Sequence, residues 1–211
     1  MKLLMKRLLS LLALLAWAVP ALAQTPEEIL SRMEAELTRH ENDGVIMTVD
    51  VKIPLLGTMT TKSWMLGDKM RMDARMLGVD IITWSDGKTK WTYNSKSKEV
   101  EIENEDPNNP TSSDGDTEMF EGITDDFDVT IKKETEEAWH FLCKKSKDNK
   151  DEDIPKKMDL VVSKANYYPV SLSATMSGMK ITMRDISFGV TEKQVSFDIK
   201  DYPDAKIVDK R

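Results

Sequence analysis

The sequence has 211 residues with 30 basic and 37 acidic side chains, which gives a formal net charge of -7 at pH 7. This length fits one domain. An acidic chain is poorly suited to nucleic acid, because phosphate backbones are bound by clustered lysine and arginine. The same charge opposes electrostatic attraction to anionic lipid.

The N-terminal residues have the pattern of a secretory signal. A basic stretch (residues 1–7) is followed by an apolar run from Leu8 to Val19 and by the small-residue sequence Ala21-Leu22-Ala23. We expect cleavage after Ala23, so that residues 1–23 are removed and the remaining 188 residues carry a formal net charge of -10, since the removed part holds three basic and no acidic side chains. A retained membrane anchor is the alternative, but the apolar run is shorter than the roughly 20 residues that a spanning helix needs.

The mature chain is expected to begin with a helix. Thr25 is placed to cap it, Pro26 to occupy its first position and Glu28 to complete a capping box. Apolar residues then recur at helical spacing, at Ile29, Leu30, Met33 and Leu37. The sequence Asn42-Asp43-Gly44 predicts the end of this helix.

Most of the remaining chain alternates between apolar and polar residues, as half-buried strands do. Six strands in meander order are predicted at 45–53, 58–65, 69–76, 79–84, 89–93 and 99–103. Later strands are predicted at 128–132, 139–145, 158–163, 170–176 and 179–188, the last with a bulge near Arg184-Asp185 where the alternation slips. Val195, Phe197 and Ile199 predict a final strand, and the whole pattern amounts to about eleven strands.

Residues 104–126 interrupt the alternation. They are rich in acidic residues, asparagine, proline, serine and glycine, apart from Met119, Phe120 and Ile123, which fit one side of a short helix. A solvated loop is one interpretation. A lid that carries Phe120 over an opening is the other, because long loops in compact domains are often functional.

So many one-sided strands cannot be covered by one or two helices. We therefore predict an α+β, mostly β fold: a strongly curved antiparallel sheet that forms an incomplete barrel, with the N-terminal helix and a short lid over an apolar cavity. Methionine suits a surface that moulds to a flexible apolar ligand, although core filling is the plainer explanation for any single one. The residues expected to line the cavity are Met47, Val49, Val51, Trp64, Met70, Met72, Met76, Trp91, Leu172, Met176, Ile181, Met183 and Phe197.

Catalysis has little support in the sequence. His40 and His140 have no metal-ligand spacing between them, and no nucleophile elbow or phosphate-binding glycine loop is present. The only cysteine, Cys143, alternates with Trp139 and Phe141 and so predicts a buried structural thiol without a disulfide partner. We expect a protein that is not an enzyme and has no metal or cofactor.

The hairpin at the centre of the sequence resembles that of the periplasmic outer-membrane lipoprotein carrier family, LolA. The resemblance lies in Asp86-Gly87-Lys88-Thr89 with Trp91 and Tyr93-Asn94, after a strand that carries Trp64. The ending, with Phe197, Pro203 and Val208-Asp209-Lys210-Arg211, is also similar. The resemblance covers essentially the whole mature chain as a pattern and is strong in the hairpin.

This resemblance implies a monomeric periplasmic carrier that shields the acyl chains of lipoproteins from water in an incomplete barrel with a helical lid. It also implies an inner-membrane donor complex and an outer-membrane acceptor as partners. A non-transporting envelope sensor, or a partner-binding protein on the same fold, is the alternative function.

One position departs from the family. An Arg-Pro pair that helps to latch the lid in typical members is replaced here by Gly67-Asp68. Arg71 is the nearest candidate latch. The region of the lid is also more acidic and less apolar than in typical members, so cargo or gating can differ.

Overall fold

The computed structural model describes residues 24–55, 57–106, 120, 122–152 and 154–211. The signal peptide predicted for residues 1–23 and the lid residue Met119 lie outside this part of the chain. No helix within it is both long and apolar enough to span a membrane.

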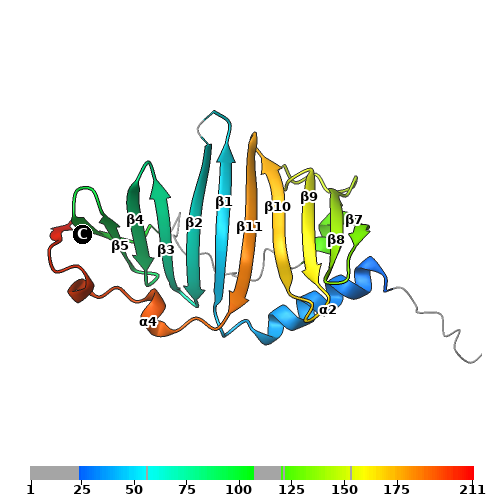
Figure 1. The fold of residues 1–211 in the computed structure, drawn as a ribbon, viewed down its shortest axis with the longest axis horizontal. Coiled ribbons are helices and arrows are strands. Elements are labelled where there is room, and N and C mark those ends of the chain that lie inside the picture. The colour runs from blue at the N-terminus through cyan, green and yellow to red at the C-terminus, as the bar shows by residue number, and fades with distance from the viewer. Residues whose placement is uncertain (1–23, 56, 107–119, 121, 153) are drawn as a thin grey trace, which may run out of the picture.

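The described chain forms a single sheet of twelve strands that curves without closing (Figure 1). Its order is β12-β6-β5-β4-β3-β2-β1-β11-β10-β9-β8-β7, and each neighbouring pair is antiparallel except β12 with β6. The strands are β1 Val45–Ile53, β2 Gly57–Leu66, β3 Lys69–Met76, β4 Val79–Ser85, β5 Thr89–Asn94, β6 Glu99–Asn104, β7 Phe127–Glu134, β8 Ala138–Lys145, β9 Lys157–Ser163, β10 Pro169–Met176, β11 Met179–Phe188 and β12 Lys206–Asp209. The expected mostly β fold with an unclosed, curved sheet is confirmed.

The N-terminal helix, α2 (Pro26–Arg39), begins as predicted. The backbone N–H of Glu28 donates to the Thr25 hydroxyl at 3.2 Å, and the Thr25 N–H donates to the Glu28 carboxylate at 3.1 Å. This capping box satisfies two of the backbone donors that a helix start leaves free. The apolar stripe of the helix is buried at Ile29, Leu30, Met33 and Leu37.

The stripe of α2 packs on one face of the sheet, over β7–β10 (Figure 1). The core beneath it consists of Phe127, Trp139, Phe141, Cys143, Met158, Leu160, Val162 and Leu172. Phe120 and Ile123 are buried in the same core, and Ile123 begins the short helix α3 (Ile123–Asp126). We call the side of the sheet that meets α2 the helix face.

The opposite side, here the aromatic face, follows from the strand register. Trp64 pairs with Arg71, Arg71 with Trp84, and Trp84 with Trp91. Residues directly opposite each other in paired strands share a face, and successive residues alternate between faces. Met65 and its partner Met70 therefore lie on the helix face, whereas the three tryptophans lie on the aromatic face.

The prediction of a final strand over Val195, Phe197 and Ile199 is wrong. Val195 ends the helix α4 (Glu192–Val195) and is buried, and Ile199 begins the 3-10 helix η2 (Ile199–Asp201). Between them, Phe197 is extended over the aromatic face and packs on Trp91. Apolar alternation also arises in an extended segment that covers a sheet without joining it, and this explains the error.

The last strand is instead β12, which pairs in parallel with β6 through partners such as Ile207 and Val100. The bulge predicted near Arg184-Asp185 is confirmed. The pairing of β1 with β11 slips between Ile46 with Ser187 and Thr48 with Arg184, and Asp185 has a φ of 56°.

Candidate functional site

A methionine-rich strip lies on the helix face beyond the edge of the α2 core. Met47, Met65 and Met70 are buried there, on β1, β2 and β3. Val49, Met72 and Met183 pack against this group and are only partly buried. The strip therefore continues the apolar surface beneath α2 toward the other end of the sheet.

Strand register aligns the centre of the strip into one row across the sheet. The row runs through Leu172, Met183, Val49, Thr61, Ala74 and Ile81. It crosses six neighbouring strands, from β10 to β4, and at about 4.8 Å between strands it is roughly 24 Å long. Leu172 is buried, while the other residues of the row are half-buried.

Most of the residues predicted to line a cavity lie on the helix face, but not all are covered. Met47, Met70 and Leu172 are buried, and Met76, at the end of β3, is 56% exposed. The half-exposed members are Val49, Val51, Met72, Met176, Ile181 and Met183. The structure thus brings these side chains onto one continuous surface, on which some are buried, most are half-buried and Met76 is exposed.

Trp64, Trp91 and Phe197 do not belong to this surface, which corrects the expected cavity lining. The register places both tryptophans on the aromatic face, and Phe197 stacks on Trp91 with ring centroids 5.6 Å apart. Alternation within a single strand does not say which side of the sheet its apolar residues face. The pairing of Met65 with Met70 places Met65 on the helix face, and its neighbour Trp64 therefore lies on the aromatic face.

Trp91 instead joins Trp84 in a packed cluster beneath the C-terminal segment, residues 191–205. Trp84, which is 3% exposed, lies 5.3 Å from the ring of Phe197 and 5.5 Å from that of Tyr202. Tyr93 contacts Tyr202 at 4.4 Å. This cluster attaches the C-terminal segment to the sheet and serves as a second core.

Arg71, the candidate latch, also belongs to the aromatic face. Its guanidinium lies over the rings of Trp64 and Trp84, at 5.1 and 5.4 Å from their centroids. It also donates two hydrogen bonds to Asp73, at 2.7 and 2.8 Å. Phe120 and Ile123, the two expected lid residues within the described chain, pack with α2 on the helix face, so the structure does not bring Arg71 together with either of them.

The position of Phe120 bears on the two interpretations of the central interruption. Its side chain is 1% exposed and that of Ile123 is 2% exposed, and both contact the α2 core. In this conformation they are core residues beneath the helix. These two side chains are therefore not part of a solvated loop.

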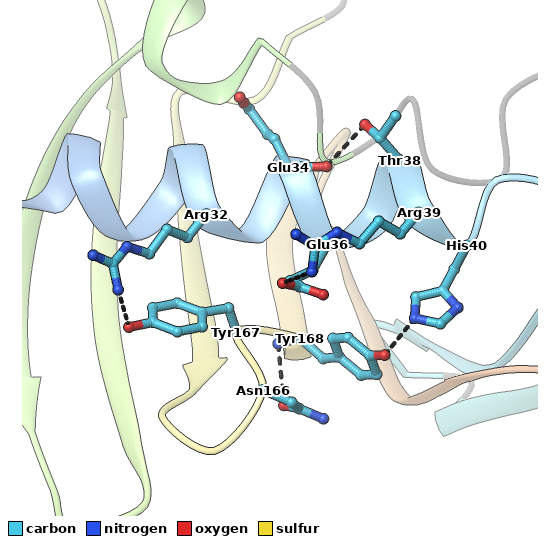
Figure 2. Close-up of polar contacts among 9 residues, drawn as sticks. All are labelled: Arg32, Glu34, Glu36, Thr38, Arg39, His40, Asn166, Tyr167 and Tyr168. Atoms are coloured by element: carbon cyan, nitrogen blue, oxygen red, sulfur yellow. Dashed lines mark hydrogen bonds and ion pairs between the residues drawn. The ribbon is translucent and has the colours of Figure 1, made fainter.

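Sequence reasoning missed a polar cluster where α2 ends. Nδ1 of His40 lies 2.6 Å from a carboxylate oxygen of Asp43. Its Nε2 shares a 2.5 Å hydrogen bond with the Tyr168 hydroxyl (Figure 2). The imidazole also stacks on Phe188, with centroids 4.8 Å apart. These residues line a pocket of about 450 Å³. Tyr168 is distant in sequence, so no local pattern could have revealed its contact with His40.

A second contact ties α2 to the same turn. Nη1 of Arg32 donates to the Tyr167 hydroxyl at 2.8 Å (Figure 2). The Gln24 side chain donates to the same oxygen at 3.1 Å. The β9–β10 turn thus holds both ends of α2 in place over the core. We assign these polar contacts to positioning the helix.

Cys143 is fully buried, as predicted, and burial together with the nearby Asp159 raises the pKa of its thiol to about 11. A thiol with so high a pKa is a poor nucleophile at neutral pH. Among the described residues, no three histidine, cysteine or acidic side chains converge as metal ligands do.

No family model and no curated protein matches this sequence. Solved structures with a similar fold do exist. The chain is similar to an uncharacterized conserved protein from Thermus thermophilus, at 17% identity and a TM-score of 0.46, over 89% of this chain and all of the other.

It is also similar to a LolA superfamily protein from Nitrosomonas europaea, at 11% identity and a TM-score of 0.34, over 83% of this chain and 99% of the other. MucB, solved in complex with MucA, is similar at 10% identity and a TM-score of 0.44, over 85% of this chain and 62% of MucB. At these identities and TM-scores the similarity assigns no family, ligand or partner.

Proposed function

We propose that this protein is a periplasmic carrier that holds the acyl chains of lipoproteins, or of related lipids, against the helix face and moves them from the inner to the outer membrane. The observation that carries the proposal is the half-exposed apolar row from Leu172 to Ile81. A folded protein that keeps such a row incompletely covered has a surface suited to an apolar guest.

The dimensions of the row suit an acyl chain. At roughly 24 Å it exceeds the half-thickness of a bilayer hydrocarbon core of about 30 Å, the depth that a lipid tail spans in one leaflet. Each buried methylene is worth about 0.8 kcal/mol. Such a row can therefore hold a tail firmly enough to keep it out of water.

The chemistry of the row favours a flexible guest. Met183 in the row and Met72 beside it on the same face are unbranched and polarizable, so they can follow the shape of a mobile tail. Thr61 and Ala74, within the row, have small side chains. The tail would extend from the edge of the α2 core across β1–β4. Carriage requires no reaction, and we assign none.

Binding of a fluorescent fatty acid such as dansyl-undecanoic acid tests the proposal. We expect saturable binding to the mature chain, weakened at least about tenfold by Met72→Glu or Met183→Glu, because a buried carboxylate opposes an apolar tail. Met72→Leu is the matched control and should bind within about threefold of the wild type, since the swap conserves apolar volume.

Circular dichroism of each variant separates lost binding from lost folding. A wild type that takes up no probe would refute the proposal. So would a folded Met72→Glu variant that binds as well as the wild type.

A partner-binding envelope sensor is the second candidate, and one feature favours it. β7 (Phe127–Glu134) ends the sheet, and its outer edge pairs with no strand in the described chain. An open edge can accept an extended segment of another protein. A carrier should release acylated lipoprotein from membranes in solution, whereas a sensor should capture a protein whether or not that protein is acylated.

A further inference from the structure

Three neighbouring hairpin turns lie together at one end of the sheet. They join β1 to β2, β3 to β4 and β10 to β11, and Figure 1 shows them along the same edge. The strands that they connect are consecutive in the sheet, in the order β4-β3-β2-β1-β11-β10. Side chains on the three turns can therefore touch one surface at the same time.

Two of these turns expose a leucine where a leucine is unfavourable. Leu55 and Leu77 are fully exposed, and their backbones are left-handed, with φ of 68° and 51°. Non-glycine residues rarely adopt this conformation, and asparagine tolerates it better than leucine. In the third turn the residue with the left-handed backbone is polar, as is more usual at an exposed turn: Ser177 has a φ of 50° and precedes Gly178.

Leu55 and Leu77 therefore lower the stability of the fold in two ways, through their left-handed backbones and through their exposed apolar side chains. Packing of the fold does not explain why leucine occupies these positions. Met76, which precedes Leu77, is a further exposed apolar side chain at the same end. Leu55, Met76 and Leu77 together form an exposed apolar group at the ends of the strands.

Basic side chains flank this apolar group. Lys52 and Lys180 lie directly opposite each other on β1 and β11 and are both exposed. Like charges in this arrangement destabilise a strand pair. Beside them, Lys156 and Lys157 join Lys180 around a pocket of about 330 Å³, together with the hydroxyl residues Ser173 and Thr175.

Two acidic side chains near these positions have basic partners of their own. Asp80 pairs with Arg75 at 3.5 Å, and Asp159, which also lines the pocket, pairs with Lys132 at 3.4 Å. Four lysines, Lys52, Lys156, Lys157 and Lys180, thus gather at this end of the sheet although the whole chain is acidic and the loop before Lys156 also carries Asp148, Asp151 and Glu152. Exposed apolar side chains with lysines beside them complement a bilayer surface that carries anionic headgroups.

From these features we infer that the three-turn end of the sheet docks on an anionic lipid bilayer. Leu55, Met76 and Leu77 enter the boundary between headgroups and acyl chains, while Lys52 and Lys180 meet lipid phosphates. The pocket beside Lys180 accommodates a headgroup. This inference does not rest on the proposed carriage of acyl chains, because it concerns a different end of the molecule and a different partner.

Co-sedimentation of the mature chain with vesicles tests the inference. One set contains phosphatidylcholine with one quarter phosphatidylglycerol, and the other phosphatidylcholine alone. We expect binding to the anionic vesicles, weakened about tenfold by Leu55→Asn and about tenfold by Leu77→Asn. Lys52→Glu and Lys180→Glu should each weaken binding to the anionic vesicles about fivefold.

The leucine variants separate docking from folding. Asparagine accepts a left-handed backbone more readily than leucine, so the midpoint of thermal unfolding should stay constant or rise while vesicle binding falls. Val170→Asn removes an exposed apolar side chain from β10 outside the turns and is the control. It should bind as the wild type does.

A wild type that binds neither set of vesicles would overturn the inference, as would leucine variants that bind unchanged or equal binding to both vesicle sets. Met72→Glu should still bind vesicles, because Met72 lies on the helix face away from the turns. A chain that binds anionic vesicles but no fluorescent fatty acid would uphold this inference and refute the carrier proposal.

Discussion

Gly44 shows how one residue fixes the start of the sheet. It lies between α2 and β1 with a φ of 68°, and its backbone sits against the carbonyl oxygen of Met65 and the side chain of Val190. A Cβ at this position would overlap the Met65 carbonyl oxygen and lie 2.9 Å from Cβ of Val190. Val190 cannot move away freely, because its own N–H donates a hydrogen bond to the Asp43 carbonyl.

We therefore expect Gly44→Ala to lower the free energy of unfolding by about 2 kcal/mol or more, through backbone strain and overlap together. Gly57→Ala is the matched control. Gly57 also has a positive φ, of 98°, but a Cβ there would meet nothing within 4 Å. Gly57→Ala should lower the free energy of unfolding by only about 1 kcal/mol, from backbone strain alone. Urea unfolding of both variants measures the difference, and equal losses would contradict this explanation.

At the scale of elements, the C-terminal segment has a packing role that the aromatic cluster explains. Phe197 stacks on Trp91 and meets the edge of Trp84, whereas Ile199, two residues later, is 43% exposed. The segment is thus attached mainly through its aromatic side chains.

Phe197→Ala should destabilise the fold by about 2 kcal/mol, because it removes half-buried aromatic surface and three ring contacts, with Trp84, Trp91 and Tyr202. It should also shift tryptophan fluorescence to longer wavelength, since Trp84 and Trp91 gain solvent. Ile199→Ala should change neither property appreciably. An unshifted emission spectrum for a folded Phe197→Ala variant would show that the segment does not shield these tryptophans.

The same element shows what the sequence can and cannot predict. Capping by Thr25 and Glu28 is local, so the start of α2 was predictable to the residue, and alternation located β1–β6 closely. Alternation alone does not say which phase faces which side of the sheet. That depends on register across turns, as with Trp64 and Met65, and on segments that cover the second face.

Part of the candidate site was predictable for the same reason. Val49, Met72 and Met183 fall on the apolar phase of their own strands, and pairing places them on one surface. The cluster of His40 with Tyr168 and the face of Phe197 depend on contacts between distant segments. No short-range pattern encodes such contacts.

At the scale of the whole molecule, the sheet presents two differently covered faces and one unusual end. α2 covers the helix face over β7–β10, and the C-terminal segment covers the aromatic face beside β4 and β5. On the helix face of β1–β4, the row from Val49 to Ile81 stays half-exposed. The net charge of the whole chain does not predict how charge is distributed over its surface. The acidic composition argues against contact with anionic lipid, yet lysines gather at the three-turn end.

Crosslinking with a photoactivatable fatty acid, mapped by peptide mass spectrometry, tests the central claim most directly because it separates the two faces. The proposed carrier function predicts labels on helix-face residues of β11, β1 and β3, above all Met183, Val49 and Met72, and their loss when unlabelled fatty acid competes. Labels confined to the aromatic face, around Trp64 and Trp91, or labelling that no competitor reduces, would contradict it.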